Sequence, residues 1–317
     1  MPGEFELIAR HFAALTPARG GVVLGPGDDA ALLDLPPGHE LVVTVDTLVA
    51  GVHFFDDCPP EALGHKALAV NLSDLAAMGA EPAWALLALT LPVADDAWLA
   101  QFASGFAALA REFDVSLVGG DTCRGPLAIS VTALGHAPRG QALRRRGARP
   151  GDGVYVSGEI GAAGLAVQAR RREITLPPVL AAHAAQRLDY PQPRVALGLA
   201  LRGLASAAID VSDGLLADLG HICAASRTGA RLDLNRLPLP DGALDVASHD
   251  SLLGSGDDYE LCFTVPPQHA PTLPALAASA GCAVTRIGQI EAAPGLWLVD
   301  ATGNVRPAAR GGHDHFR

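Results

Sequence analysis

The sequence of 317 residues predicts a two-domain protein of the α/β (α+β) class. The chain is longer than a usual single domain. With 49% hydrophobic and 18% charged residues it can bury a compact core. Strand-like and helix-like segments alternate in both halves. The composition changes to Arg, Gly and Pro between Pro138 and Gly153, so we expect an N-terminal domain over residues 1–138 and a C-terminal domain over residues 150–317.

The N-terminal half predicts two helices and four strands. Amphipathic patterns predict a helix over Glu4–Leu15 and a second one from about Pro60 to Met78. Runs rich in β-branched and apolar residues predict strands at Leu41–Val45, Ala85–Leu91, Val115–Val118 and Leu127–Leu134.

The C-terminal half restarts with a strand over Val154–Val156, a glycine-spaced loop and two or three helices. A strand over Ala207–Val211 then enters a helix near Asp213. Further strands are expected at Arg231–Leu234, Glu260–Val265, Ala283–Ile290 and Leu296–Val299. There is no short-period repeat, although two mixed domains would allow an old duplication.

Composition excludes several classes of protein. A formal net charge of -11 opposes a nucleic-acid-binding surface, which needs dense basic residues. Lys66 is the single lysine, so the charge of a phosphorylated ligand must be met by arginine, backbone amides or cations. The five cysteines are scattered, which indicates a reducing compartment. Residues 1–15 do not form a signal peptide, and Leu75–Val93 is a poor membrane span because it contains Glu81 and two prolines, so we expect a cytoplasmic protein.

Acidic residues gather where strands end or loops turn, and this is the main functional signal. Hard cations such as Mg²⁺ prefer oxygen ligands, and carboxylates that converge without cations would repel each other. We therefore expect several Mg²⁺ ions completed by a phosphate chain. The acidic positions are Asp28, Asp29, Asp46, Asp74, Asp121, Asp210, Asp213, Asp257 and Asp258.

Structural explanations remain open for three of these motifs. Asp74 shares the apolar face of its helix with Leu63, Ala67 and Val70, so it is either a ligand or a buried cap or ion pair. Ser212 could be a simple N-cap, although two flanking carboxylates beside a helix N-terminus favour a metal and phosphate site. Gly119-Gly120 could be a plain turn.

Other motifs are weaker. The glycines at 158, 161 and 164 do not form the dinucleotide fingerprint, and helix packing explains them equally well. The run Arg144-Arg145-Arg146 would usually be a solvated face. The sequence contains no zinc motif, no P-loop and no protein-kinase signature.

In order, the blocks GPGDDAALL, VTVDTLVAGVHF, KALAVNLSDLAAMGAEPAW, GGDTCRGPLAIS, AIDVSDGLLADLGHI, GDDYELCF and GGHDHF resemble the thiamine-monophosphate kinase family. Its superfamily also holds aminoimidazole ribonucleotide synthetase and selenophosphate synthetase. The resemblance covers nearly the whole chain. It implies a homodimer in which the N-terminal domain forms an intersubunit β-barrel, and a C-terminal α/β sandwich domain. It also implies ATP-dependent phosphorylation of thiamine monophosphate to thiamine diphosphate.

The resemblance implies a set of site residues. Positions that match the family's metal ligands are Asp29, Thr44, the main chain of Val45, Asp46, Asp74, Asp121, Asp210 and Asp213. Positions that match its ATP contacts are Gly120, Asp121, Arg145 and Ser212. Positions that match its substrate contacts are His53, Asp257 and His313.

Three of these residues depart from the family pattern. Asp257 stands where the family has Glu, His313 where an aromatic residue is common, and Val45 where threonine is common. The first two departures bear on contacts to the organic part of the substrate. The third should matter little, because only the carbonyl group would bind metal.

A phosphate monoester acceptor is already ionised near neutral pH, because its second pKa is about 6. A direct in-line transfer without a general base or a phosphoenzyme is therefore expected. Two alternatives remain. One is another ATP-dependent synthetase of the superfamily, although no cysteine precedes Cys58. The other is a non-enzymatic protein that binds thiamine phosphates.

Overall fold

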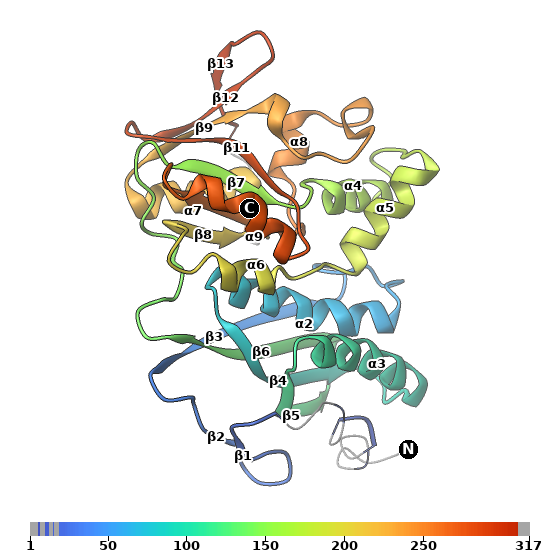
Figure 1. Cartoon of the computed structure of the whole chain (residues 1–317). Coiled ribbons are helices and arrows are strands. Elements are labelled where there is room, and N and C mark those ends of the chain that lie inside the picture. The colour runs from blue at the N-terminus through green and yellow to red at the C-terminus, as the bar shows by residue number, and fades with distance from the viewer. Residues whose placement is uncertain (1–5, 7–9, 13–14, 16–18, 310–317) are drawn as a thin grey trace. The chain divides into compact units, whose positions relative to one another are not determined.

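The computed structural model describes residues 6, 10–12, 15 and 19–309. The chain divides into two compact units, and each is described by itself. The N-terminal unit comprises residues 1–75 and 80–140, and the C-terminal unit comprises residues 76–79 and 141–317. Each unit combines helices with a β-sheet, which confirms the predicted fold class (Figure 1).

The N-terminal unit is built on a four-stranded sheet in the order β3-β6-β4-β5. β4 and β5 are parallel, and the other neighbours are antiparallel. All four predicted strands exist, and all four are longer than the sequence pattern indicated. Their bounds are β3 His39–Val49, β4 Glu81–Leu91, β5 Ser116–Arg124 and β6 Ala128–Pro138. A separate antiparallel pair is formed by β1 Val22–Leu24 and β2 Leu32–Leu33.

Two helices, α2 (Pro60–Ala77) and α3 (Asp96–Glu112), lie beside this sheet (Figure 1). Sequence reasoning predicted α2 but missed α3. The Asp95 side chain caps α3 by accepting hydrogen bonds from the amides of residues 97 and 98, at 2.9 and 3.1 Å. The predicted helix over residues 4–15 lies largely outside the described residues.

Glycines let α2 and α3 approach closely. A Cβ at Gly64 would lie 2.0 Å from the backbone oxygen of Phe102, and one at Gly105 would lie 1.9 Å from that of Glu61. Real Cβ atoms do not come that close to an oxygen, so both positions require glycine if the crossing is to stay as it is.

The C-terminal unit contains a seven-stranded sheet in the order β13-β12-β9-β11-β7-β10-β8. β9 and β12 are parallel, and the other neighbours are antiparallel. The strands are β7 Gly153–Ser157, β8 Ala207–Asp210, β9 Gly229–Asp233, β10 Leu261–Val265, β11 Val284–Glu291, β12 Gly295–Val299 and β13 Val305–Pro307. The helices are α4 Ala162–Arg170, α5 Pro178–Asp189, α6 Val195–Ala200, α7 Leu215–Ser226, α8 His249–Gly254 and α9 Leu273–Ser279.

Helix α7 packs its apolar face into the core of this unit. Leu215, Leu219 and Ile222 are fully buried, as the 3.6-residue pattern predicted, and they belong to one cluster with Val154 and Val156 of β7. This packing fixes the N-terminal end of α7 beside the end of β8, where the acidic motif of residues 210–213 lies.

The three glycines after β7 serve packing. A Cβ at Gly158 would lie 2.1 Å from the Glu260 carboxylate, and one at Gly164 would lie 2.2 Å from the Cβ of Ser255. Gly161 has φ +92°, a conformation that favours glycine. These contacts favour the packing interpretation of this motif.

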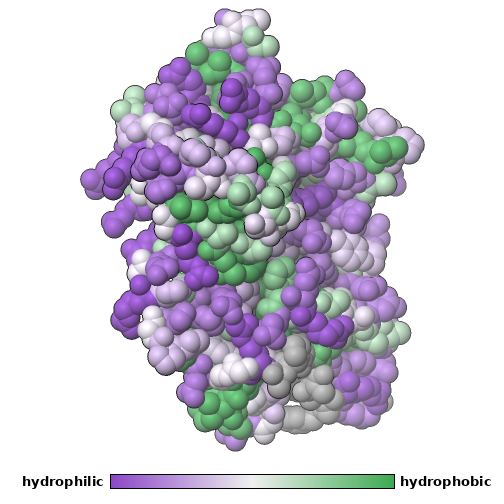
Figure 2. Space-filling view, in the orientation of Figure 1, coloured by the Kyte–Doolittle hydropathy of each residue, from purple (hydrophilic) through white to green (hydrophobic). Residues whose placement is uncertain are grey.

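Hydrophilic residues predominate on the face shown in Figure 2, where a hydrophobic patch lies over β1 and β2. Val23 and Leu32 of these strands are 61% and 56% exposed. None of the helices in the described part of the chain is long and apolar enough to cross a membrane.

Candidate metal and nucleotide site

Strand β3 and helix α2 bring Thr44, Asp46 and Asp74 together. Thr44 and Asp46 pair across the strands with the buried residues Ala133 and Val131, so their side chains share the buried face of the sheet. The Thr44 hydroxyl donates a hydrogen bond of 2.5 Å to Oδ2 of Asp74. The sequence prediction that Asp74 faces inward therefore matches its half-buried position.

Asn71 fixes the backbone of this cluster. The Asp46 amide donates to Oδ1 of Asn71 at 3.1 Å, and the Asn71 side-chain amide donates to the carbonyl of Ala67, one turn earlier in α2, at 3.0 Å. Asn71 is fully buried. Sequence reasoning did not assign it a role, although it stands three residues before Asp74 and therefore on a neighbouring part of the same helix face.

The electrostatics of the cluster favour a cation. Burial and the nearby Asp74 carboxylate both raise the pKa of Asp46, from 3.8 to about 6. The three side chains offer only oxygen atoms, which suits a hard divalent ion such as Mg²⁺. Such an ion would relieve the repulsion between the two carboxylates, so the residues present fit the expected metal.

Asp29, Gly120 and Asp121 line a pocket of about 1030 Å³ within the N-terminal unit. The pairing of the strands places Asp121 in a row with Ala88, Ser130 and Thr47, on the face of the sheet away from Thr44 and Asp46. The predicted metal ligands of this unit therefore form two groups. Asp46 and Asp74 lie together, and Asp29 and Asp121 line the pocket on the other face.

Gly119 and Gly120 lie within strand β5, so the alternative of a plain turn is wrong. A Cβ at Gly120 would lie 1.9 Å from the carbonyl oxygen of Leu87. The close pairing of β4 and β5 therefore requires this glycine, whether or not a ligand also approaches it.

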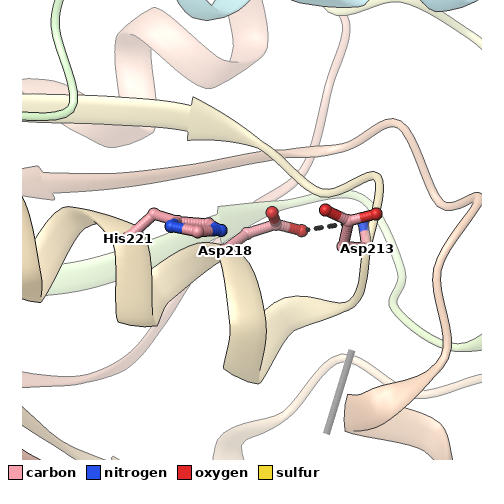
Figure 3. Close-up of side chains that lie close together, drawn as sticks. All are labelled: Asp213, Asp218 and His221. Atoms are coloured by element: carbon pink, nitrogen blue, oxygen red, sulfur yellow. Dashed lines mark hydrogen bonds between the residues drawn. The ribbon is translucent and has the colours of Figure 1, made fainter. Parts of the chain in front are cut away.

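The C-terminal unit gathers a second acidic site at the end of β8 (Figure 3). Asp210 is the last residue of β8 and is 4% exposed, whereas Ser212 and Asp213 are half-buried. The carbonyl of Ser212 accepts a hydrogen bond of 2.9 Å from the amide of Asp257. Two segments that the sequence analysis singled out separately, 210–213 and 257, are thus neighbours.

Asp218, in the first turn of α7, lies at the centre of this site and was missed by sequence reasoning. Its Oδ2 accepts hydrogen bonds from the amides of Ser212 and Asp213, each at 3.1 Å. Burial and the charge of Asp213 raise the pKa of Asp218 to about 7. One ligand atom each from Asp213, Asp218 and His221 lie within 4.8 Å of one another. The i, i+3 spacing of Asp218 and His221 is the signal that could have found them.

The acidic residues that follow Asp257 have structural partners. Asp258 accepts hydrogen bonds from the Gly161 amide at 3.0 and 2.8 Å, and burial raises its pKa. Glu260 is fully buried and forms ion pairs with Arg187 and Arg194. Asp257 itself is half-buried and has φ 68°. Its Oδ1 atom accepts a hydrogen bond of 3.0 Å from the hydroxyl of Tyr259.

The remaining residues predicted to contact ATP or the substrate, where the structure describes them, do not lie together in either acidic site. The Nδ1 atom of His53 accepts a hydrogen bond of 3.0 Å from the amide of Val49. Arg145 is exposed, and its carbonyl accepts from the hydroxyl of Ser226 at the C-terminal end of α7. The main chain of Arg145 therefore lies about 18 Å along the helix axis from the Ser212 end, at a rise of about 1.5 Å per residue. His313 lies outside the described residues.

Comparisons with known proteins agree with this architecture. Residues 27–137 match the family model of the AIR synthase related protein, N-terminal domain, and residues 149–300 match that of the C-terminal domain. The chain is 49% identical to the thiamine-monophosphate kinase of Salmonella typhimurium, covering 92% of this chain and 91% of the relative. It is 47% identical to the thiamine-monophosphate kinase of Escherichia coli, covering 99% and 98%.

Solved structures give the same picture. A thiamine-monophosphate kinase from Stenotrophomonas maltophilia superposes with a TM-score of 0.86 at 46% identity, covering 96% of this chain and 97% of that chain. AaThiL complexed with AMPPCP and TMP superposes with a TM-score of 0.76 at 30% identity, covering 99% and 97%. The hydrogenase maturation protein HypE of Escherichia coli shares the fold at 22% identity, with a TM-score of 0.80 and coverage of 97% and 98%.

Proposed function

The chain belongs to the thiamine-monophosphate kinase family, and we propose that it transfers the γ-phosphoryl group of ATP to thiamine monophosphate, forming thiamine diphosphate and ADP. The observation that carries this proposal is the near full-length similarity to kinases of that name. A relative of the same fold is solved with AMPPCP and TMP, which supports ATP and thiamine monophosphate as the two substrates. The protein is thus an enzyme of thiamine diphosphate biosynthesis.

Mg²⁺ is the proposed metal, because the carboxylates of both acidic sites and the Thr44 hydroxyl are oxygen donors. The ions would neutralise the phosphate charges and stabilise the charge that develops during transfer. The residues proposed to hold them are Asp29, Thr44, the main chain of Val45, Asp46, Asp74, Asp121, Asp210 and Asp213.

The protein's own residues would bind and orient the two substrates. Gly120, Asp121, Arg145 and Ser212 are the proposed ATP contacts, and His53, Asp257 and His313 are the proposed substrate contacts. Since Nδ1 of His53 accepts the Val49 amide, a neutral His53 imidazole carries its proton on Nε2.

The position of Arg145 argues against a shared role with Ser212. Its main chain lies at the opposite end of α7 from Ser212, so the two residues are not proposed to bind the same phosphate groups. We place its ATP contact on a different part of the nucleotide. No general base or covalent nucleophile is required, because the acceptor phosphate is already ionised.

A homodimer is proposed from exposed apolar residues of the N-terminal sheet. Val43 and Val45 of β3 are 54% and 60% exposed, and Leu86 of β4 shares a cross-strand row with Val45. β3 is an edge strand, and exposed apolar strands of this kind mark interaction surfaces. A second copy would cover this face and could form the intersubunit β-barrel. The N-terminal domain, residues 1–138, would then serve ATP, metal and dimer contacts, beside the C-terminal domain, residues 150–317.

A cytoplasmic location is proposed from the cysteines, since none of the five, all within the described residues, forms a disulfide, and a reducing compartment would keep them reduced.

The kinase activity is tested with purified protein, ATP, Mg²⁺ and thiamine monophosphate. Thiamine diphosphate is measured by chromatography and ADP by a coupled assay, with thiamine and other monophosphates as control acceptors. Equal amounts of ADP and thiamine diphosphate are expected. Binding of thiamine monophosphate without ADP release would instead show a non-enzymatic binding protein, and ADP release with another acceptor alone would show a different synthetase.

A further inference from the structure

The Asp218 carboxylate holds the loop that precedes α7. One oxygen, Oδ2, accepts hydrogen bonds from two consecutive amides, those of Ser212 and Asp213, each at 3.1 Å. Figure 3 shows the bond between Asp213 and Asp218. Asp218 is 2% exposed, so little water competes for these bonds.

The loop is also held from its other side. The carbonyl of Ser212 accepts the amide of Asp257 at 2.9 Å, and a Cβ at Gly256 would lie 2.0 Å from that carbonyl oxygen. Gly214, at φ 114°, lets the chain turn into α7. The main chain of Ser212 is therefore bonded through its amide to Asp218 and through its carbonyl to Asp257, and that of Asp213 is bonded through its amide to Asp218.

We propose that Asp218 is a positioning residue for nucleotide and metal binding: by accepting the Ser212 and Asp213 amides it fixes the directions of the Ser212 hydroxyl and the Asp213 carboxylate. This inference rests on the proposed function, which assigns Ser212 to ATP and Asp213 to metal. Partners that orient metal ligands typically change metal affinity or activity about 10–100-fold when removed.

One consequence concerns how phosphate is bound. The amides of Ser212 and Asp213 are occupied by Asp218, so this loop does not offer them to a phosphate group. A phosphate group can therefore approach only the side chains of Ser212 and Asp213. The neighbouring carboxylates of Asp213 and Asp218 would repel such an anion. A divalent cation between Asp213 and the phosphate chain resolves this conflict.

A competing role for Asp218 is direct metal ligation together with Asp213 and His221, since their ligand atoms lie within 4.8 Å of one another. Positioning is favoured because Oδ2 of Asp218 already accepts two amides and the carboxylate is buried, whereas His221 is exposed. The two roles predict different effects for neutral substitutions.

The test compares Asp218→Ala, Asp218→Asn and His221→Gln in the full chain. The readouts are the Mg²⁺ concentration for half-maximal activity, the KM for ATP, and Mn²⁺ binding in the presence of ADP measured by electron paramagnetic resonance. Asp218→Ala should raise the Mg²⁺ requirement about 10–100-fold. Asp218→Asn keeps an oxygen that accepts both amides and should stay within about threefold of wild type, and so should His221→Gln.

Asp152→Ala is the matched control for loss of stability. Asp152 is 3% exposed in the same unit and accepts hydrogen bonds from the Arg149 amide at 2.9 Å and the Ser206 hydroxyl at 2.6 Å. Its replacement should lower the melting temperature without changing the Mg²⁺ requirement. If Asp218→Ala does not fold, Asp218→Asn decides by itself, because direct ligation predicts a rise of about tenfold or more.

Three outcomes overturn the proposal: a wild-type Mg²⁺ requirement in folded Asp218→Ala, a tenfold rise in Asp218→Asn, or an equal rise in His221→Gln. If the kinase assignment itself is wrong, the wild-type protein will form no thiamine diphosphate. In that case Mn²⁺ binding by the same variants still tests the positioning role.

Discussion

Replacing Asp46 by Asn should stabilise the metal-free protein while abolishing its catalysis. The pKa of Asp46 is raised from 3.8 to about 6 by burial and by Asp74. Because a tenfold change in an acid constant corresponds to about 1.4 kcal/mol, the ionised carboxylate lowers the free energy of unfolding by about 3 kcal/mol. The Asn side chain is nearly the same size and carries no charge, so it removes this penalty.

The difference in stability between the wild-type protein and Asp46→Asn should depend on pH. Below pH 3.8 the Asp46 carboxyl is protonated in both the folded and the unfolded protein, and it contributes no difference. As pH rises to about 6 the unfolded chain ionises first, so the wild-type protein loses stability relative to Asp46→Asn. The difference in unfolding free energy should therefore grow from near zero at about pH 4 to about 3 kcal/mol above about pH 6.

Urea denaturation in EDTA measures this difference. Trp84 and Trp98 lie in the same unit as Asp46, so their fluorescence reports its unfolding. With a urea dependence of about 1–3 kcal/mol/M, the midpoint for Asp46→Asn should rise by about 1–3 M at pH 7.5. Asp34→Asn, an exposed carboxylate in the same unit, is the control and should change stability by less than about 0.5 kcal/mol. An Asp46→Asn protein that is less stable than wild type, or that keeps normal turnover at saturating Mg²⁺, would refute the reasoning.

Gly105→Ala should lower stability by about 1–3 kcal/mol in thermal unfolding, because its Cβ would meet a backbone oxygen of α2 at 1.9 Å; an unchanged melting temperature would show that the helices can move apart. Glu260→Gln should cost about 3–5 kcal/mol, since it leaves Arg187 and Arg194 without their buried carboxylate; denaturation at the wild-type urea midpoint would contradict this. Val43→Lys should shift the protein from dimer to monomer in light scattering, and a persisting dimer would place the interface elsewhere.

The sequence patterns predicted most of the elements of the fold because their signals are local. The apolar spacing of Leu215, Leu219 and Ile222 predicts α7, and all three are buried. Helix α3 also carries local signals, which are Asp95 as N-cap and an amphipathic pattern that buries Leu99, Phe102 and Phe106 on one face. The sequence therefore contained enough local information to predict α3, and tertiary contacts are not needed to explain why this helix forms.

The sequence indicated which acidic residues could bind a cation, but it did not indicate which of them lie together. Carboxylates at strand ends indicated a cation site, and the raised pKa of Asp46 is consistent with that indication. Whether Asp121 shares a face with Asp46 depends on how β3, β6, β4 and β5 are paired, including a register shift between β4 and β5. Such long-range pairing leaves no mark in the local sequence, which explains why one predicted set of ligands proved to be two groups.

The role of Asp218 in helix α7 could not be predicted from the local sequence either. Its neighbours Leu216 and Leu219 belong to the apolar pattern of the helix, and this pattern does not assign a role to a carboxylate between them. Its partners, the amides of Ser212 and Asp213, become adjacent only because the chain turns at Gly214. The role of such a residue follows from backbone geometry that a periodic pattern does not contain.

Anomalous diffraction from crystals grown with Mn²⁺, a non-hydrolysable ATP analogue and thiamine monophosphate would locate the ions directly. The account predicts anomalous peaks within ligand distance, about 2.0–2.3 Å, of the carboxylates of Asp46, Asp74, Asp210 and Asp213. A fully occupied nucleotide with no anomalous peak beside these aspartates would contradict the claim that they bind the metal ions.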